Sequence, residues 1–178
     1  MSMYSGDPAA SRKRPVLDLP PFRLEIVLRV LVMLGIAVCI VQLALVWDAL
    51  PARVPIHFGI SGRPDRFGSK SMLLILPAVA VALALLLTLV ARFPQSFNYP
   101  VRVTPENAPR LYRQGRLLLA WLNVLVVWLF AAIEQQTVEI ALGHAHAFSN
   151  GFVVLLVAAV IGVPLSIGVL AVVWARRG

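Results

Sequence analysis

Four long apolar runs alternate with short polar segments along the chain, and the apolar runs contain few charged side chains. At about 1.5 Å of rise per residue, roughly 20 helical residues cross a hydrocarbon core of about 30 Å. The pattern therefore predicts an all-α membrane protein with four transmembrane helices. The expected spans cover about residues 24–47, 72–93, 115–137 and 152–174.

The segment before the first span, residues 1–21, is rich in proline, serine and basic residues, which predicts a mobile basic tail. Residues 22–178 then form one integral membrane domain. The first apolar run is longer than the roughly 7–15 residues at the centre of a cleaved signal peptide. It also ends at Trp47, where an interfacial anchor is expected, so we predict that this helix is retained.

The composition agrees with a membrane protein. Hydrophobic residues make up 60% of the chain and charged residues 13%, and the mean hydropathy is +0.84. These values leave too little polar surface to coat a soluble globule of 178 residues. No separate soluble domain is expected.

The net charge of +8 is distributed unevenly along the chain. Twelve of the 16 basic residues lie before or within the first span, around the second loop, or after the last span. Because cytoplasmic loops retain Lys and Arg, we expect a multi-pass protein of the cell membrane with both termini cytoplasmic. The basic residues then act as topology signals and as contacts for anionic lipid headgroups. No motif for nucleic-acid binding accompanies them.

Few polar residues lie within the spans, which argues against a buried relay for ions or protons. Gln42 and Asn123 are expected to hydrogen-bond to neighbouring helices, and Arg29 is expected to pair with Glu25 one turn earlier. Glu134 lies near the outer end of the third span, where we expect its carboxylate to reach water or an outer-loop cation.

Small residues at four-residue spacing predict where helices approach one another closely. They are Ala80, Ala84 and Thr88 in the second span, and Ala158, Gly162 and Ser166 in the fourth. The single cysteine, Cys39, has no intrachain disulfide partner and is expected to be a packing residue.

The loop between the first two spans, residues 50–70, mixes turn-forming and apolar residues in the sequence LPARVPIHFGISGRPDRFGSK. Proline and glycine favour turns, whereas the interspersed Val, Ile and Phe side chains are too apolar for a flexible linker. We expect a structured outer loop with residues 54–60 as a short extended piece. Alternation along this piece would leave His57 on the face opposite Ile56 and Phe58.

This loop resembles the outer loop in a family of small bacterial membrane proteins of largely unknown function, which is shared with the immunity protein of the sporulation-delaying toxin system. The family pattern reads IP-x-HF, SG-x-PD and GSK. The matching positions are Pro51, Val54, Pro55, His57, Phe58, Ser61, Gly62, Pro64, Asp65, Gly68, Ser69 and Lys70. The resemblance implies a four-helix domain, with immunity or signalling as the nearest functional precedent.

A second stretch, residues 98–122, resembles the cytoplasmic connection into the third helix of the same family. Thr104, followed by Pro105 and Glu106, is expected to cap the start of a helix. An amphipathic segment with three arginines would then run along the inner interface before Leu117 enters the bilayer. These arginines are Arg110, Arg113 and Arg116.

We expect the outer loops to recognise a peptide, a protein or an envelope component. The candidate binding residues are His57, Phe58, Asp65, Arg66, Lys70 and Glu134, with His144 as a neighbour. The alternative for most of these residues is a structural loop that caps the helices. The alternative function is a small transporter or transporter subunit, whose site would involve Gln42 or Asn123.

The three histidines of the outer loops are the residues most suited to metal chemistry. His57, His144 and His146 would hold a zinc ion together with nearby carboxylates, or would be surface residues that hydrogen-bond to the backbone. The chain contains no HExxH spacing, nucleophile elbow or phosphate-binding loop. We expect no enzyme activity and no cofactor, with zinc-dependent activity on the outer face as the alternative. A homo-oligomer is compatible with the small volume that four helices enclose.

Overall fold

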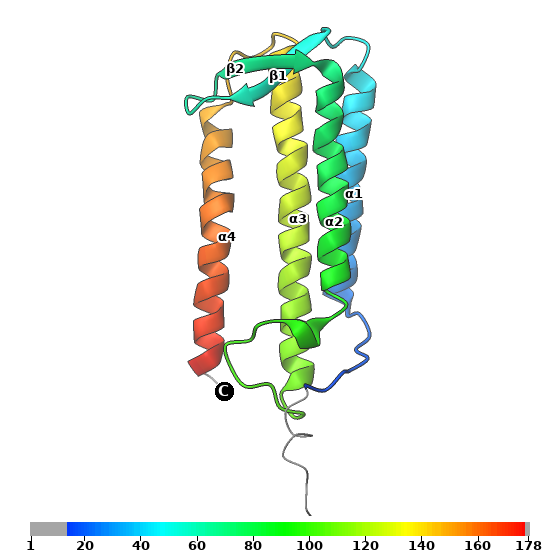
Figure 1. The fold of residues 1–178 in the computed structure, drawn as a ribbon, viewed down its shortest axis with the longest axis vertical. Helices are drawn as coiled ribbons and strands as arrows, with labels where there is room; N and C mark the ends of the chain where they lie inside the picture. Colours follow the sequence, from blue (N-terminus) through cyan, green and yellow to red (C-terminus); the bar gives the residue numbers. More distant parts are fainter. Residues whose placement is uncertain (1–13, 177–178) are drawn as a thin grey trace, which may run out of the picture.

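The computed structural model describes residues 14–176, in which long helices run roughly side by side below a β-hairpin (Figure 1). The elements are α1 (Arg23–Val46), β1 (Arg53–Phe58), β2 (Pro64–Ser69), η2 (Lys70–Leu74), α2 (Ile75–Val90), η3 (Pro94–Ser96), α3 (Ala108–Ala141) and α4 (Asn150–Arg176). We call the end that carries the hairpin the hairpin end. The opposite end, which carries the α2–α3 connection, is the basic end. Residues 1–13 of the predicted tail lie outside the described residues.

In the part of the chain that the structure describes, three helices are long and apolar enough to cross a bilayer, which indicates an integral membrane protein by length and composition. They are α1, the helical segment Lys70–Val90 that joins η2 to α2, and α3. The bounds of α1 match the predicted first span to within one residue at each end. At 34 residues, α3 is longer than the predicted third span because it begins seven residues earlier and ends four later.

The core of the bundle follows α3, which packs against both α1 and α2. Val32, Ala84 and Val127 form a buried cluster with one member from each of these helices. Close approach depends on small residues, because a Cβ added to Gly35 would lie 2.7 Å from Val127 Cγ1. Ala80 and Ala84 are buried and Thr88 is exposed, so the packing face predicted for the second span is confirmed at its two alanines. Cys39 is also buried, as expected for a packing residue.

The packing face predicted for the fourth helix is wrong at Ala158 and Gly162. In Figure 1, α4 stands apart from the other helices over most of its length. Ala158 and Gly162 are exposed, and no described atom lies within 4 Å of a Cβ built on Gly162. Small residues permit close packing but do not create it when no helix lies opposite. The side chain of Ser166 lies outside the described part of α4.

Two amides connect the membrane helices, which confirms the interhelical hydrogen bonds predicted for them. Gln42 Nε2 on α1 donates at 3.1 Å to the carbonyl of Ala131 and to one carboxylate oxygen of Glu134, both on α3. Asn123 Nδ2 on α3 donates to the carbonyl of Ala84 on α2 at 3.1 Å. Each bond gives a buried polar group a partner that the surrounding hydrocarbon cannot supply.

Glu134 does not reach water or an outer-loop cation, so that prediction is wrong. Its side chain is 0% exposed because α1 covers this face of α3 and places Gln42 against the carboxylate. Glu134 Oε2 has no hydrogen-bond partner among the described residues. The glutamate therefore belongs to the interior of the bundle.

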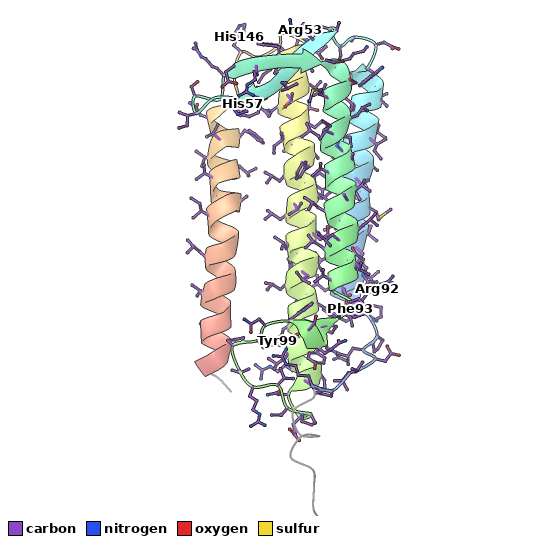
Figure 2. All side chains as sticks on the ribbon, viewed as in Figure 1. Arg53, His57, Arg92, Phe93, Tyr99 and His146 are labelled. Carbon is purple, nitrogen blue, oxygen red and sulfur yellow. The ribbon has the colours of Figure 1, made fainter. Side chains whose placement is uncertain are left out.

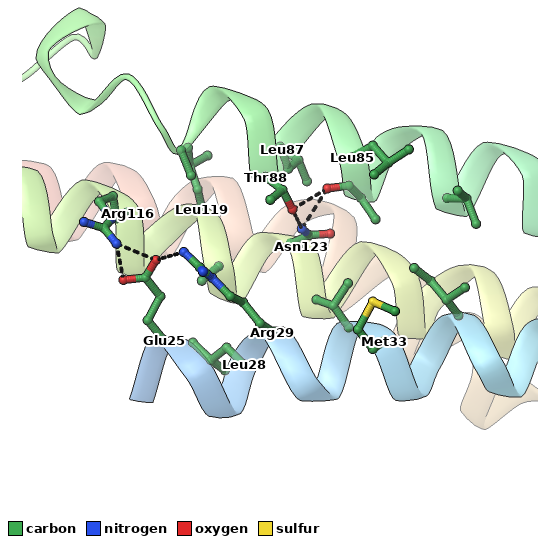
Figure 3. Close-up of a pocket in the computed structure, with 16 residues that line it drawn as sticks. Glu25, Leu28, Arg29, Met33, Leu85, Leu87, Thr88, Arg116, Leu119 and Asn123 are labelled. Atoms are coloured by element: carbon green, nitrogen blue, oxygen red, sulfur yellow. Dashed lines mark hydrogen bonds and ion pairs between the residues drawn. The ribbon is translucent and has the colours of Figure 1, made fainter. Parts of the chain in front are cut away.

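An ion pair joins α1 to α3 at the basic end, where Arg116 Nη2 donates to both oxygens of Glu25 at 2.8 Å (Figure 3). Arg116 Nη1 also donates to the carbonyl of Leu19 at 2.6 Å. The predicted pair between Arg29 and Glu25 is confirmed, with 2.5 Å between Nη2 and Oε1. Glu25 is thus buried between two guanidinium groups.

The connection into α3 differs from the prediction. Residues 110–116 form the first turns of the long helix and not a separate segment along the interface, and Arg116 points inward to Glu25. Thr104 is not the N-cap, since the helix begins after Asn107, whose side chain accepts a hydrogen bond from the Thr104 amide at 2.8 Å. A hydrogen bond from the Thr104 side chain lowers the pKa of the exposed Glu106.

Aromatic packing secures the α2–α3 connection at the basic end. Tyr99, Tyr112 and Leu111 belong to a cluster in which the two tyrosine rings are 5.9 Å apart. The Tyr112 hydroxyl donates to the carbonyl of Pro15 at 2.9 Å, which fixes the chain before α1. Burial raises the pKa of Tyr99 to about 12.

Replacing Glu25 with alanine should strongly destabilise the protein, because it leaves the Arg116 guanidinium buried without its carboxylate. We expect a loss of about 3–5 kcal/mol in the free energy of unfolding. Denaturant titration in detergent, followed by helical circular dichroism, measures this loss. The control is Arg29→Ala, which removes the exposed partner of the same carboxylate and should cost about 1 kcal/mol or less. Equal losses for the two variants would contradict the assignment of Arg116 as the essential partner.

Candidate functional site

The hairpin is an antiparallel pair of short strands, and β1 confirms the extended piece predicted in the loop. Its register pairs Arg53 with Ser69 and Val54 with Gly68, and shifts on either side of His57. The shift occurs next to Pro55, which lacks an amide proton for the ladder. Irregular pairing of this kind re-aims side chains, so simple alternation does not describe the faces of β1.

A glycine-rich turn joins the two strands. The amide of Gly59 donates to the carbonyl of Arg63, and that of Gly62 donates to the carbonyl of Gly59, both at 2.9 Å. Gly62 has φ +71°, in the left-handed region that residues with a Cβ rarely adopt. The SG-x-PD motif therefore encodes the return of the chain into β2.

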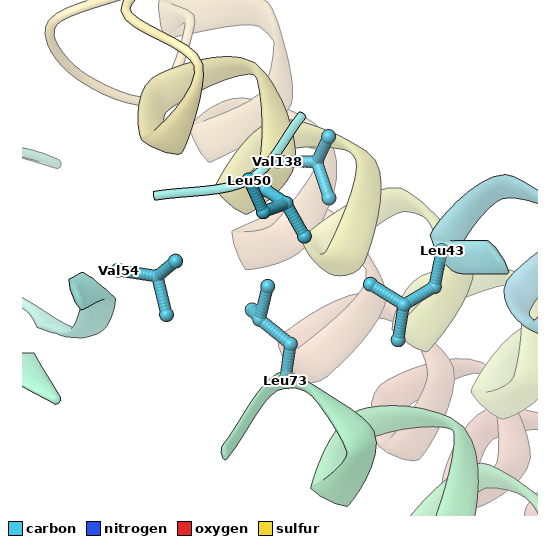
Figure 4. Close-up of a cluster of buried hydrophobic side chains, with 5 residues drawn as sticks. All are labelled: Leu43, Leu50, Val54, Leu73 and Val138. Atoms are coloured by element: carbon cyan, nitrogen blue, oxygen red, sulfur yellow. The ribbon is translucent and has the colours of Figure 1, made fainter. Parts of the chain in front are cut away.

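A buried apolar cluster seats the hairpin on the helices (Figure 4). Val54 from β1 packs with residues from α1, α3, η2 and the loop before the hairpin. The members are Leu43, Leu50, Val54, Leu73 and Val138. Burial of a valine-sized side chain contributes roughly 1.5–3 kcal/mol, so the hairpin is a packed cap and not a free loop.

Lys70 pins the hairpin to the end of α1. Its Nζ donates to the carbonyl of Trp47 at 3.2 Å and lies 4.9 Å from the centre of the Trp47 ring. A cation over an aromatic face is attracted by the ring quadrupole. Of the two roles considered for Lys70, the structure supports the attachment of the loop to the helix end.

The α3–α4 loop packs on the hairpin through an aromatic contact that the sequence did not predict. The Phe148 amide donates to the carbonyl of Gly62 at 2.9 Å, and its ring stacks on Phe58 with centroids 4.0 Å apart. Phe152, at the start of α4, lies against Phe148 at 5.2 Å. Two phenylalanines four residues apart across the start of an apolar run are the signal that could have indicated this contact.

The exposed surface of the hairpin carries a hydrogen-bonded pair across the strands. His57 Nδ1 lies 2.6 Å from Asp65 Oδ1, and the two side chains are 55% and 50% exposed. Because a carboxylate only accepts hydrogen bonds, the imidazole donates from Nδ1 in this pair. Arg66 is paired with His57 in the register and is also exposed. All three of these candidate residues are exposed on the hairpin.

The histidines do not form a metal site among the described residues, which contain no group of three or more His, Cys, Asp or Glu able to hold an ion. His144 pairs instead with Glu139, at 3.0 Å between Nδ1 and Oε2. His146 lies in the α3–α4 loop, at the same end of the molecule as His57 of β1 (Figure 2). Glu134 does not belong to this surface, because it is buried between helices.

A small apolar pocket lies beneath the hairpin. Its volume is about 210 Å³, which suits an apolar side chain better than a whole cofactor, since small-molecule sites occupy roughly 300–1,000 Å³. Its walls come from β1, η2, α2 and α3. The lining residues are Pro55, Ile56, Phe58, Met72, Leu73, Ile75, Leu76, Ile133 and Thr137. Phe58 thus both stacks on Phe148 and lines this pocket.

Comparison with known proteins assigns the chain to a family. A family model described as a domain of unknown function, DUF1648, matches residues 34–81, which include the whole hairpin. An uncharacterised protein of Archaeoglobus fulgidus is 45% identical over 126 residues, which cover 60% of this chain and 67% of that protein. This chain belongs to the same family of unknown function. The relative is archaeal, so the family is not confined to bacteria. No solved structure matches the chain.

Replacing Gly62 with alanine should loosen the hairpin turn. Alanine at this position would have to adopt φ +71°, and its Cβ would lie 3.3 Å from Phe148 Cβ. A left-handed alanine costs about 1 kcal/mol in the stability of the turn, which corresponds to roughly fivefold faster hydrogen exchange of the turn amides. Exchange measured by mass spectrometry on residues 59–63 and on the Phe148 amide tests this.

The control is Gly151→Ala on α4, where no described atom lies within 4 Å of the added Cβ. Exchange of residues 59–63 should match the wild type in this variant. Unchanged exchange in the Gly62→Ala variant would show that the turn does not require glycine at this position.

Proposed function

We propose that this integral membrane protein recognises an extended peptide or protein segment, or a similar envelope component, on its hairpin end. The observation that carries the proposal is the apolar pocket under a rigidly seated hairpin. Recognition by binding, without catalysis and without a cofactor, is the role of this surface. An immunity- or signalling-like activity has the nearest precedent in proteins with the same loop motif.

The chemistry of the hairpin indicates the kind of segment that fits. Ile56 and Phe67 are exposed apolar residues, and a third apolar side chain, Ile60, extends from the turn. In the described residues the sheet has two strands, so one edge of each strand pairs with no other strand, and an added strand would pair at such an edge. A bound segment would place an apolar side chain in the pocket and an acidic group near Arg66 or Arg53.

We further propose that α4 is a fourth transmembrane helix and that both chain termini are cytoplasmic. α4 has 27 residues, enough to span a hydrocarbon core. The distribution of charge supports this orientation, because the basic end carries most of the Lys and Arg residues. The hairpin then faces the outside of the cell membrane, and a homo-oligomer is compatible with the exposed apolar helix faces.

Cysteine labelling should show this topology. In a Cys39→Ala background, Ile60→Cys should react with a membrane-impermeant maleimide in intact cells. Arg102→Cys should react only after the membrane is permeabilised, since it lies at the basic end. A C-terminal fusion to green fluorescent protein should be fluorescent, and the matching alkaline phosphatase fusion inactive. The reverse result for the C-terminal fusions would exclude the fourth crossing.

Photo-crosslinking should detect the recognised partner. A photoreactive phenylalanine analogue at Ile56 or Phe67 should give a discrete peptide or protein adduct in cells. The matched control is the same analogue at Leu45, an exposed position on α1, which should give only lipid adducts. Adding Asp65→Ala or Arg66→Ala should reduce the hairpin adduct several-fold without changing the amount of protein in the membrane.

Two outcomes would contradict recognition by the hairpin. Adducts to lipid alone at all three positions would leave no partner for this surface. Protein adducts that are indifferent to Asp65 and Arg66 would show that neither residue takes part in recognition. A small transporter or transporter subunit would then be the better-supported function. The buried Glu134, which accepts from Gln42 and whose Oε2 has no hydrogen-bond partner among residues 14–176, supports that second candidate, because buried ionisable groups in membrane helices often lie on ion or proton pathways.

A further inference from the structure

A second cavity lies at the basic end, away from the hairpin. It is a groove with α1 on one side, α2 on the other and α3 behind (Figure 3). Its volume is about 490 Å³, within the roughly 300–1,000 Å³ typical of small-molecule sites. No residue of α4 lines the groove in the described part of the chain, and none of its lining residues belongs to the hairpin.

The walls of the groove are apolar along most of its length. Val32 and Met33 of α1 face Val81 and Leu85 of α2 across it, and Ala120 contributes to the α3 side. On α1 the lining extends from Glu25 to Ile36, which corresponds to roughly 16 Å at about 1.5 Å of rise per residue. That length is about half of a hydrocarbon core of roughly 30 Å. The groove therefore has the depth of one leaflet.

The end of the groove nearest the basic end is charged. One carboxylate, Glu25, lies between the guanidinium groups of Arg29 and Arg116, which leaves one unit of positive charge. Arg116 is buried and engaged on both Nη atoms, so it has little capacity for another ligand. Arg29 contacts Glu25 through Nη2 alone, and its side chain is 54% exposed. Its guanidinium is the group available to an anion.

We propose that the groove binds one anionic phospholipid from the leaflet at the basic end. The phosphate lies on Arg29, and one acyl chain lies between α1 and α2. A guanidinium offers two parallel donors to a phosphate, and Glu25 holds Arg29 at the mouth of the groove. The combination of one net positive charge with an apolar channel one leaflet deep matches an anionic head joined to a hydrocarbon tail. A zwitterionic head gains less at this position because its own cation is repelled.

Native mass spectrometry of the full chain tests the proposal after detergent purification and removal of bound lipid. Dioleoyl phosphatidylglycerol and dioleoyl phosphatidylcholine are titrated separately. We expect one phosphatidylglycerol per chain, bound about tenfold more tightly than phosphatidylcholine. Arg29→Gln should remove most of this preference. Ala120→Phe, which places a ring in the groove, should reduce occupancy by both lipids about tenfold.

Matched variants separate the groove from general effects. Arg92→Gln removes a cation at the same end that does not line the groove, and Ala82→Phe adds a ring at an exposed position on α2 outside it. Both should bind phosphatidylglycerol like the wild type. Thermal unfolding should show that Arg29→Gln remains folded, because Glu25 keeps its bond to Arg116.

Several results would overturn the proposal. Equal weakening by Arg29→Gln and Arg92→Gln would indicate diffuse charge attraction. Binding unaffected by Ala120→Phe would show that the chain lies elsewhere. Competition by glycerol 3-phosphate as effective as that of the lipid would indicate a site for free phosphate. A dimeric mass that lipid does not displace, and that Ala120→Phe abolishes, would indicate a second copy of the chain in the groove.

Discussion

The ion pair between Glu25 and Arg116 belongs to a stripe of buried polar side chains on α3 that holds the membrane helices in place. Asn123 and Glu134 continue the stripe, at spacings of seven and eleven residues that return to within about 20° of the same helix face. Each has its partner on α1 or α2, for example Gln42 for Glu134. Polar groups in hydrocarbon must be satisfied within the protein, so these contacts determine how α1, α2 and α3 meet.

The hairpin depends on this bundle for its shape. A two-stranded sheet is marginal in water by itself, and here it gains stability from Val54 in the apolar cluster and from Lys70 on Trp47. Phe148, from the α3–α4 loop, also holds the hairpin by donating to the Gly62 carbonyl and stacking on Phe58. Several motif residues are therefore structural, whereas the candidate residues His57, Asp65 and Arg66 are exposed.

The two cavities have different chemistry because they lie in different surroundings. The pocket at the hairpin end is small and lies next to exposed strands, which suits side chains of a peptide. The groove at the basic end is larger, one leaflet deep and charged at its end, which suits a lipid. α3 contributes to both cavities, through Ile133 in the first and Arg116 in the second. Because this helix is continuous from Ala108 to Ala141, the two sites share one rigid element.

The sequence alone determined the three apolar spans confirmed in α1, in the segment Lys70–Val90 and in α3. It also determined the extended piece in the loop and the pairing of Arg29 with Glu25. These features follow from composition or from contacts within one helical turn, where spacing fixes geometry. The sequence also identified Gln42 and Asn123 as interhelical donors, because polar groups in a span must bond to something. Only the tertiary structure decided that Arg116 turns inward to a residue 91 positions earlier and that Glu134 is buried. The same holds for Phe148 against the hairpin, because such contacts depend on which helix faces meet, and local patterns do not encode that choice.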